Sequence, residues 1–593
     1  MGRRQGCEKE RLATDSKFVA KKANSEGRLW LCWLAFSAKQ RLNLAAERTK
    51  AVSYRTQYTQ ITFNRQFSDN WPGSAKLRYR CSDGAGLLRK SKKIVFFFPS
   101  FASSEATAPL GILAVATPLK RAGYDVVLID STITPNFKQR VLSEIKDALC
   151  LGISLVTGPM IRETVDIARS IKAWDPDFPI VLGGWHPSLL PKQTLEAPYI
   201  DYIVRGQGEF SFLELVQHIE AGAAPDLIPG IGFKRDGRLV MTQERPLKPL
   251  VEMPPKAYEL ADFDAYERAS GKRWAMYTSS LACPYNCGYC TNAGVYGRKW
   301  NALPAEQFVE ETVDLSRRYN LEMLWIVDDN FLVDLDRARA IAEGLVRENS
   351  HYTWSIQATT NLSARLSPED LKLLYRAGLR QICQGAESGS PKVLKAMNKN
   401  FQDFGTIYES AGRIVKAGIR PSFNIIFAFP GEGEKERRET ISFILDVCRK
   451  FPGAEFWTNI FTPYPGAPIM DRIAELGVHT PDTFEGWADF FPRYTKLPWL
   501  DGKDHKELQV MRDYLRIAFD RIPIKADRRS RFMRAAQKCI SLPARWRLDH
   551  GVYGFPVELW LNDKLKERMP GFKPVVDAKR LEPNEIPAEA AAC

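Results

Sequence analysis

The sequence has no apolar run long enough to cross a membrane. A spanning helix needs roughly 18 apolar residues in a row, and the nearest run, at 29–36, has about eight. That run follows a basic stretch, as in a secretory signal, but the Ser-Ala-Lys-Gln that comes next is a poor cleavage site. We therefore expect a cytoplasmic protein with no membrane span.

Cysteine is sparse, and excess charge is confined to one end of the chain. Eleven cysteines in 593 residues cannot form a dense disulfide framework, and eight of them are scattered. Residues 1–93 hold 21 basic and 7 acidic residues, so the rest of the chain is neutral, with 63 of each sign. A neutral body is atypical of an enzyme that binds nucleic acid over a basic face, and we expect no nucleic-acid partner.

Residues 1–92 lack any sustained periodicity and mix basic residues and serine with isolated aromatics. This composition predicts a basic, poorly ordered leader. Two interpretations stay open: the stretch lies upstream of the true start, or it binds RNA or acidic lipid. The length of the chain beyond it predicts two or three domains.

Residues 93–228 alternate between apolar runs and amphipathic stretches. Strands are expected at 94–98, 125–129, 150–154, 180–182 and 202–204, with helices between them. This pattern predicts a Rossmann-like open parallel sheet, whose ligands bind beyond the carboxyl ends of its strands. Small residues and one histidine occupy those ends, where glycine permits close approach to a large ligand: Ser154, Gly183, Gly184, His186, Gly206 and Gly208.

The remaining chain divides into three predicted segments. Residues 229–268 contain a hairpin-like piece and a proline-rich stretch and are expected to form a linker. Residues 269–485 carry six strand and helix repeats, which predict a partial (β/α)6 barrel with its chemistry at the carboxyl ends of the strands. Residues 486–593 predict a small, mostly helical region, so the fold class is α/β throughout the body.

Three cysteines lie on one predicted loop directly after the first barrel strand. Cys283, Cys287 and Cys290 are separated by three and two residues, a spacing that lets three thiolates hold three corners of a 4Fe-4S cluster. No fourth ligand is near, so one iron would stay open. A zinc site would want such a ligand, and the nearest histidines, His218 and His351, are more than sixty residues away. Zinc or merely buried thiols are the alternatives.

With Tyr289 before the last cysteine, the C-x3-C-x2-C motif resembles the radical S-adenosylmethionine (SAM) family. The resemblance implies that SAM chelates the open iron and that its reductive cleavage yields a 5′-deoxyadenosyl radical. It also implies a low-potential electron donor such as ferredoxin or flavodoxin. The residues that would contact SAM lie on the cysteine loop and at later strand ends: Tyr289, Asp328, Glu387, Pro430, Gly431 and Pro463.

The upstream domain resembles the cobalamin-binding subgroup of that family. The resemblance covers about 94–480 and rests on Gly183-Gly184-x-His186-Pro187 and Gly206-x-Gly208-Glu209. Some members supply a lower axial histidine after the first strand, but residues 98–123 contain none. The resemblance therefore implies base-off cobalamin with no protein histidine ligand. His186 is expected to form hydrogen bonds in a loop, and a flavodoxin-like domain without cobalamin is the alternative.

These motifs predict a cobalamin-dependent radical SAM enzyme that methylates an unactivated carbon of a small molecule, lipid or natural product. One SAM would methylate cobalamin and a second would supply the radical. An oxidative cyclase or rearrangement enzyme, resembling the anaerobic magnesium-protoporphyrin monomethyl ester cyclase, is the first alternative. A methylthiolase would require a second group of three cysteines upstream, and a non-catalytic iron–sulfur or cobalamin sensor would require four cluster ligands.

The C-terminal region adds two open interpretations. Its basic residues, including Arg528, Arg529 and Arg531, form a solvated face or capture an acidic or phosphorylated substrate. Four aromatic residues before it either line a hydrophobic pocket or pack the barrel mouth: Trp487, Phe490, Phe491 and Trp499.

Overall fold

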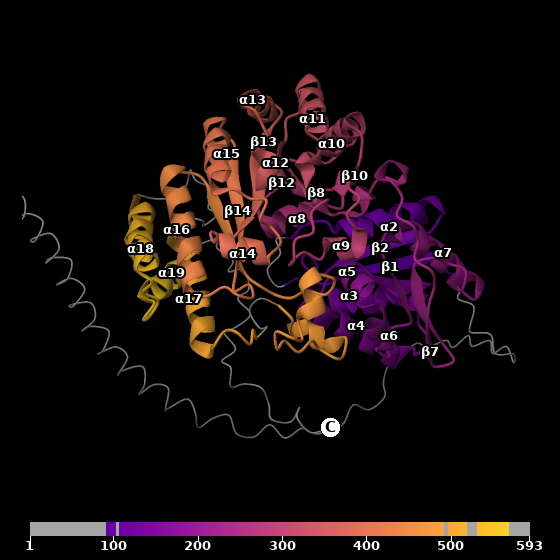
Figure 1. Cartoon of the computed structure of the whole chain (residues 1–593). Coiled ribbons are helices and arrows are strands. Elements are labelled where there is room, and N and C mark those ends of the chain that lie inside the picture. Colours follow the sequence, from indigo (N-terminus) through magenta and orange to yellow (C-terminus); the bar gives the residue numbers. More distant parts are fainter. Residues whose placement is uncertain (1–90, 102–105, 492–495, 519–530, 568–593) are drawn as a thin grey trace, which may run out of the picture. The chain divides into compact units, whose positions relative to one another are not determined.

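The computed structural model describes residues 91–101, 106–491, 496–518 and 531–567, with the backbone alone at 531–538, 563 and 565–567 (Figure 1). Almost all of the expected leader, as well as Arg528 and Arg529, therefore lies outside the described residues, and only the backbone of Arg531 is described. The described residues belong to one compact unit. No helix in the described ranges is long and apolar enough to span a membrane.

A seven-stranded sheet forms the first domain, in the order β2-β1-β3-β4-β5-β6-β7. Its first five strands are parallel, as expected, and β1 lies between β2 and β3, so the strand order reverses there. The strands are β1 (Lys93–Phe98), β2 (Asp125–Asp130), β3 (Cys150–Ser154), β4 (Ile180–Gly183), β5 (Tyr202–Val204), β6 (Ile231–Arg235) and β7 (Arg238–Met241).

The last two strands lie within the expected linker but extend this sheet. β6 pairs antiparallel with β5, and Asp236 and Gly237 adopt positive φ in the turn to β7. An Asp-Gly turn of this kind matches the twist of two antiparallel strands. The sheet therefore continues to Met241, beyond the expected end of the domain at 228.

Helices cover both faces of the first sheet because its strands are apolar on both sides. Ile94 and Phe96 of β1 pack in the core under α2 and α7, whereas Val95 and Phe97 pack in the core under α3 and α4. The helices are α2 (Leu110–Arg121), α3 (Phe137–Glu144), α4 (Met160–Trp174), α5 (Trp185–Leu189), α6 (Pro191–Glu196) and α7 (Gly208–Ala221).

The second sheet is entirely parallel, in the sequential order β15-β14-β13-β12-β11-β8 that a partial barrel requires. A short ladder of β9 and β10 adjoins the cysteine loop. The strands are β8 (Trp274–Tyr277), β9 (Ser280–Leu281), β10 (Asn301–Ala302), β11 (Met323–Ile326), β12 (Thr353–Thr359), β13 (Leu379–Glu387), β14 (Arg420–Phe427) and β15 (Glu455–Ile460).

The helices of the barrel begin at residues suited to that position. Asp334 and Asp403 accept a backbone hydrogen bond at the starts of α11 and α15, and Ser367 and Asp370 cap α13 reciprocally. The helices are α8 (Phe263–Ser270), α9 (Asn292–Tyr296), α10 (Ala305–Tyr319), α11 (Leu335–Arg347), α12 (Thr360–Ser363), α13 (Pro368–Arg376), α14 (Pro391–Ala396), α15 (Phe404–Lys416) and α16 (Glu434–Lys450).

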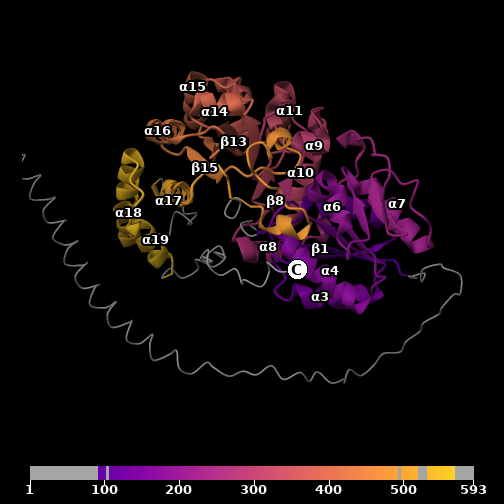
Figure 2. The ribbon, with the colours of Figure 1, turned by 60° about the horizontal axis from the view of Figure 1, so that its bottom comes forward.

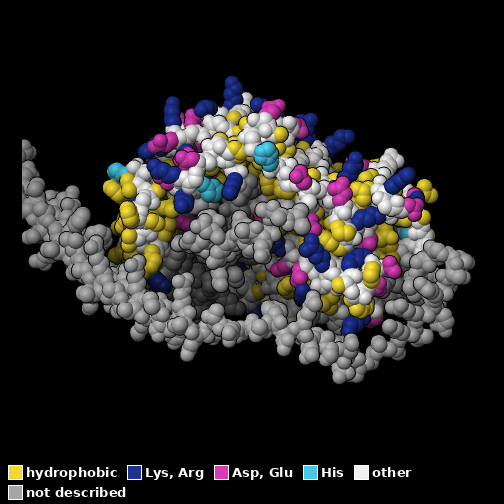
Figure 3. All heavy atoms as spheres, turned by 90° about the horizontal axis from the view of Figure 1, so that it is seen from below, with side chains coloured by type: hydrophobic (Ala, Val, Ile, Leu, Met, Phe, Trp, Pro, Cys, Tyr) yellow, Lys and Arg dark blue, Asp and Glu magenta, His cyan; other side chains and the backbone are white. Residues whose placement is uncertain are grey.

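Three C-terminal helices, α17 (Gly502–Ala518), α18 (Arg531–His550) and α19 (Val557–Glu567), pack together beside α16 (Figures 1 and 2). Leu508 and Tyr514 of α17, and Ala544 and Leu548 of α18, share the core of β14 and β15. Hydrophobic side chains also reach the surface where α18 and α19 lie, at the left edge of Figure 3.

The aromatic residues before these helices pack rather than line a pocket. Trp487 and Phe490 belong to the core of the first domain, and the Phe491 ring meets Phe101 edge-on at 5.3 Å. Trp499 donates a hydrogen bond from Nε1 to the Ala428 carbonyl at 3.0 Å. The chain thus returns to the first domain before it enters α17.

Candidate active site

The three cysteines occupy one loop that neighbouring backbone holds in place. The loop follows β9 through Ala282, whose φ is 66°. The Gly288 amide donates to the Met397 carbonyl at 2.8 Å, and the Ile469 amide donates to the Gly288 carbonyl at 2.9 Å. The Asn398 side chain donates to the Asn286 carbonyl at 2.7 Å. Residues that follow β13 and β15 therefore order the loop that begins after β9.

The thiols fit a cluster rather than a single metal ion. All three are free, Cys287 is buried, and Cys283 accepts a hydrogen bond from the Asn330 side chain at 3.8 Å. Across the described residues, no three His, Cys, Asp or Glu side chains converge on one point, and in a 4Fe-4S cluster each thiolate binds a separate iron. Burial raises the pKa of Cys290 to about 11 in the metal-free chain, so iron must displace these protons.

Glu387 and Tyr289 meet at a lysine that the sequence did not single out. Lys399 is almost fully buried and pairs with the Glu387 carboxylate at 2.9 Å, and its ammonium donates to the Tyr289 hydroxyl at 3.2 Å. Glu387 ends β13 with φ of 62°. A Cβ at Gly385 would lie 2.6 Å from the Lys399 ammonium. The backbone is therefore shaped around this buried pair, beside Cys287.

The Asp328 carboxylate is hydrogen-bonded inside the fold, whereas the next residue, Asp329, faces the cavity. The Asp328 carboxylate accepts hydrogen bonds from the Ser279 amide and hydroxyl, both at 2.6 Å, and from the Ser280 hydroxyl at 2.7 Å. Arg337 donates to the same Ser279 hydroxyl at 2.9 Å. Asp328 thus fixes the turn that precedes Cys283, whereas Asp329 lines the cavity, where burial raises its pKa to about 6.

The two proline turns lie together beyond β14 and β15. Phe429, before Pro430, meets Phe461, near Pro463, with ring centres 4.9 Å apart. Gly431 has φ of 88°, which lets Glu432 turn back and accept a hydrogen bond from the Ala428 amide. Burial raises the pKa of Glu432 to about 8. Its second carboxyl oxygen has no hydrogen-bond partner within the described structure.

A cavity of about 610 Å³ separates the carboxyl ends of the first sheet from β8, β11 and α10 of the barrel. Its lining includes five of the six residues expected to contact cobalamin: Ser154, Gly183, Gly184, Gly206 and Gly208. A Cβ at Gly184 would lie 2.6 Å from the Leu155 carbonyl, and φ there is 98°. This close backbone cradle with apolar walls fits a large, planar corrin.

His186 is not part of the cavity wall. It is fully buried, with one ring nitrogen 2.9 Å from the Thr157 hydroxyl, and its ring packs against Phe484 and Trp487. Burial lowers its pKa to about 3, so the ring is neutral. It forms a hydrogen bond, as expected, but from helix α5 rather than from a loop, and none of the described residues that line the cavity is a histidine.

Charged side chains also line the cavity, and sequence reasoning did not find two of them, Lys256 and Glu311. Glu311 accepts hydrogen bonds from the Tyr277 hydroxyl and from Gln307, both at 2.7 Å. Lys256 donates to the Thr278 carbonyl at 3.3 Å, and burial lowers its pKa, against the attraction of Glu311 and Glu209. Glu209 also lines the cavity, and burial raises its pKa. Glu209 belongs to the glycine motif at the start of α7, whereas Lys256 comes from the linker and Glu311 from α10, outside any motif.

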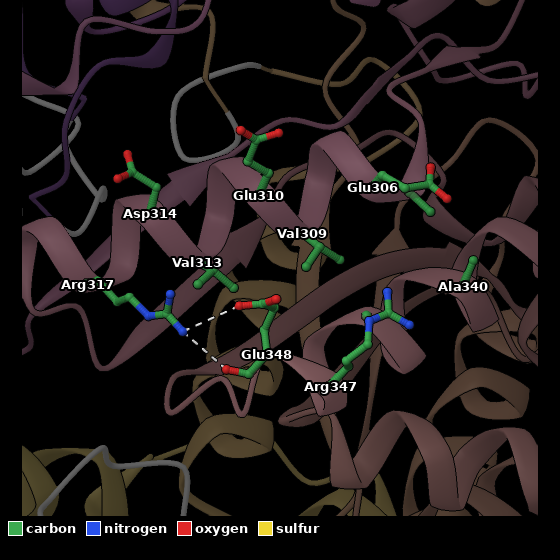
Figure 4. A pocket seen from close by; sticks show the side chains of 11 residues that line it. Glu306, Val309, Glu310, Val313, Asp314, Arg317, Ala340, Arg347 and Glu348 are labelled. Atoms are coloured by element: carbon green, nitrogen blue, oxygen red, sulfur yellow. Dashed lines mark hydrogen bonds and ion pairs between the residues drawn. The ribbon is translucent and has the colours of Figure 1, made fainter.

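A second hollow, of about 400 Å³, lies between α10 and α11 (Figure 4). Glu306, Glu310 and Asp314 project along α10, and Arg317 pairs with Glu348 at 3.5 Å. None of the expected site residues lines it. It lies on the helical layer rather than at the strand ends, so the cavity between the two sheets is the candidate active site.

Comparisons with known proteins agree with this geometry. The B12 binding domain matches residues 103–216, and the Radical SAM superfamily matches residues 277–444. The chain therefore carries a B12-binding domain followed by a radical SAM domain. The matched segments contain all three cluster cysteines and all six residues expected at the cobalamin site.

Two curated relatives match long stretches of the chain. An uncharacterized methyltransferase of Pyrococcus horikoshii is 28% identical over 367 residues, which is 61% of this chain and 78% of the relative. The anaerobic magnesium-protoporphyrin IX monomethyl ester cyclase of Synechocystis is 29% identical over 304 residues, 50% of this chain and 60% of the relative.

A solved structure has the same fold. The radical SAM methyltransferase TsrM of Kitasatospora setae, with cobalamin and a [4Fe-4S] cluster bound, matches with a TM-score of 0.56 and 18% identity, covering 66% of this chain and 76% of that one. The likeness extends over both domains of the body.

Proposed function

We propose that this enzyme methylates an unactivated carbon of a small molecule, lipid or natural product, with cobalamin as the methyl carrier. The observation that carries the proposal is that one and the same cavity opens onto the glycine cradle of the first sheet and onto the polar strand ends beside the cysteine loop. A methyl carrier and a radical source would meet there. The similarity to a methyltransferase supports this choice of reaction.

Different residues would bind the cluster, bind SAM and enclose the reaction. Cys283, Cys287 and Cys290 would hold the cluster, and Lys399 with Glu387 and Tyr289 would hold SAM beside its open iron. When bound, SAM and the cluster supply a 5′-deoxyadenosyl radical, and cobalamin supplies the methyl group. The buried walls of the cavity exclude water and other hydrogen donors. A low-potential ferredoxin or flavodoxin would deliver the electron.

Cobalamin would bind base-off, without a histidine ligand. His186 is held among aromatic rings, and the described lining of the cavity offers no other imidazole. The lower face of the corrin would therefore meet apolar side chains or water. Spectra of the cob(II)alamin form should lack the nitrogen coupling that an axial histidine produces.

The cavity also indicates the kind of substrate. Most of its lining is apolar, and the charges of Lys256, Glu209 and Glu311 gather on the walls near α7 and α10. Such a site suits a mainly apolar molecule with one polar or charged group, because each buried charge needs a partner.

The decisive test is product analysis under anaerobic conditions. The purified chain is reconstituted with iron, sulfide and hydroxocobalamin, then given SAM and a low-potential reductant. We expect both 5′-deoxyadenosine and S-adenosylhomocysteine, measured by mass spectrometry. Cys283→Ala should abolish 5′-deoxyadenosine because the cluster loses a ligand, whereas Cys539→Ala, an exposed cysteine on α18, should leave it unchanged.

Two other results would change the assignment. Formation of 5′-deoxyadenosine without S-adenosylhomocysteine would favour an oxidative cyclase or rearrangement enzyme, a reading that the similarity to a monomethyl ester cyclase supports. Neither product from cluster-loaded protein would argue for a sensor. Turnover that survives Cys283→Ala would contradict radical SAM chemistry at this loop.

A further inference from the structure

The C-terminal helices expose an unusual concentration of large hydrophobic side chains. Among the described residues fourteen such side chains are well exposed, and six of them lie within residues 542–560. We call them the α18–α19 patch; they are Leu542, Trp546, Val552, Phe555, Val557 and Trp560. Hydrophobic side chains gather on this side of the body, at the left of the coloured surface in Figure 3. Scattered exposed hydrophobic residues are ordinary, but a contiguous group marks an interaction surface.

The outward faces of α18 and α19 remain exposed, because the inward faces of these helices already pack into the core. Ile540, Ala544 and Leu548 of α18, and Leu559 of α19, are buried against α17 and the barrel. Leu542 and Trp546, one helical turn apart, lie on the opposite side of α18, with 61% and 55% of their surfaces exposed. Packing of the domain therefore does not explain the patch.

The turn between the helices is built to hold a phenylalanine outward. Phe555 is 90% exposed and has φ of 49°, a conformation that is strained for a bulky residue. Arg547 donates to the carbonyls of Gly554 at 2.7 Å and Phe555 at 3.1 Å, and pairs with Glu558 at 3.0 Å. This guanidinium fixes the turn, so the exposed ring is presented in a defined position.

The charge of the C-terminal helices indicates which partner binds the α18–α19 patch. α18 carries five basic residues and one acidic residue, and α19 carries two basic and three acidic residues, so the two helices together hold three more basic than acidic residues. A second copy docked on the same face would bring two such basic helices together, which is unfavourable. An anionic surface with an apolar interior satisfies both the charge and the exposed rings, and tryptophan beside basic residues is typical of helices that lie in a bilayer interface.

We propose that the α18–α19 patch docks the enzyme peripherally on an anionic lipid bilayer, with Phe555, Trp546 and Trp560 inserted at the interface. The contact does not depend on the chemistry at the cavity, and it needs no membrane-spanning helix. It would hold the enzyme on the surface where an apolar substrate is concentrated.

Vesicle flotation of the full-length protein tests this directly. Vesicles of mixed phosphatidylcholine and phosphatidylglycerol are compared with vesicles of phosphatidylcholine alone. Phe555→Ser/Trp560→Ser is the test variant. Trp174→Ser/Leu227→Ser is the matched control on the first domain. Trp174, 49% exposed, matches Trp560 in exposure, and Leu227, 93% exposed, matches Phe555. The basic residues at 1–93 are present in every variant, so the difference between variants is the readout.

We expect the wild type and the control to bind the anionic vesicles equally, and the test variant to bind at least about tenfold more weakly. Binding should fall as salt rises and on phosphatidylcholine alone. Circular dichroism and thermal unfolding should be unchanged, because the replaced side chains are exposed. Equal binding by the test variant, or no binding by the wild type, would overturn the proposal. A wild-type dimer that the test variant converts to a monomer would also overturn it, in favour of self-association.

Discussion

Lys399 connects two residues that sequence reasoning selected around the cysteine loop, Glu387 and Tyr289. Its ammonium contacts both Glu387 and Tyr289; Lys399 and Glu387 are shielded from water, and Tyr289 is partly buried. A buried lysine is stable only with such partners. Nothing in the sequence distinguishes it from the surface lysines around it, because the pairing exists only after β13 and the loop at 398–402 come together.

Replacing Lys399 should affect both stability and cofactor binding. Lys399→Met leaves the Glu387 carboxylate buried without its partner, which should cost about 3–5 kcal/mol in urea unfolding. Lys399→Met/Glu387→Gln should recover most of that stability, since no lone charge remains. Both variants should still bind SAM at least tenfold more weakly, measured by equilibrium dialysis with cluster-loaded protein. Wild-type affinity in the double variant would show that the pair is purely structural.

Glu432 should make stability depend on pH. Burial raises its pKa from near 4.5 to about 8, so the folded chain holds a proton that the unfolded chain releases. The stabilisation is present at low pH and is lost as the pH rises from about 5 to 8, on the order of a few kcal/mol. Glu432→Gln should flatten this slope relative to the wild type in urea titrations at several pH values. An identical slope in both proteins would show that Glu432 titrates normally.

Asp328 and Asp329 show how far single residues could be assigned in advance. The sequence predicts a SAM contact at Asp328, after β11, but it does not distinguish Asp328 from the neighbouring Asp329, because successive side chains of an extended chain point to opposite sides. Packing directs Asp328 to Ser279 and Ser280, and Asp329 to the cavity. The contact of either residue with SAM stays a prediction.

At the scale of elements, the turn after β4 determines how close a ligand can approach the first sheet. Gly184 links β4 to α5 with positive φ, and its Cα lies against the backbone of Leu155. The three carboxyl ends of β3, β4 and β5 meet here because the strands are parallel and adjacent. The shape of the cradle is thus a property of three elements together.

Gly184→Ala should damage this cradle. The added Cβ meets the Leu155 carbonyl at 2.6 Å in a backbone conformation unfavourable for alanine, so we expect a loss of about 3 kcal/mol or more of stability. Hydroxocobalamin binding, followed by absorption, should weaken at least tenfold. Gly123→Ala is the control: its φ is also positive, but nothing lies within 4 Å, so it should cost only about 1 kcal/mol and leave cobalamin binding intact. Equal effects of the two changes would contradict a role for close approach.

Most elements were evident in the sequence because their periodicity is local. The five parallel strands of the first sheet and the six of the barrel were anticipated from apolar runs and amphipathic helices. The β6–β7 hairpin was not placed in the sheet, since its pairing with β5 depends on a distant edge. The cores that the helices share, such as that of α17 and α18 with β15, likewise depend on contacts far apart in sequence.

At the scale of the whole molecule, a buried hydrogen bond links α8 to the first sheet. The Tyr266 hydroxyl donates to the Asp130 carboxylate at the end of β2, at 2.7 Å. Nearby, the Ala257 amide donates to the Leu113 carbonyl at 2.9 Å. The segment between the two sheets is thereby held against the first domain, which keeps the walls of the cavity together.

Tyr266→Phe should weaken this connection. Asp130 is buried, and the loss of one donor should cost about 1–3 kcal/mol in urea unfolding. Tyr375→Phe, at a more exposed tyrosine on α13, should change stability little. If Tyr266→Phe unfolds like the wild type, the contact adds nothing to the coupling of the two domains.

The sequence by itself determined the two-domain α/β organisation and indicated the class of chemistry, whereas the binding of a cluster by Cys283, Cys287 and Cys290 stays a prediction. Those features are local: strand and helix periods, glycines at strand ends, and thiols within eight residues. Only the tertiary structure decided that Lys399, Asp329, Lys256 and Glu311 lie at the site and that His186 lies outside it. The tertiary structure also decided that α18 and α19 have an apolar outer face. Such assignments depend on which distant surfaces pack together, and no spacing along the chain records that.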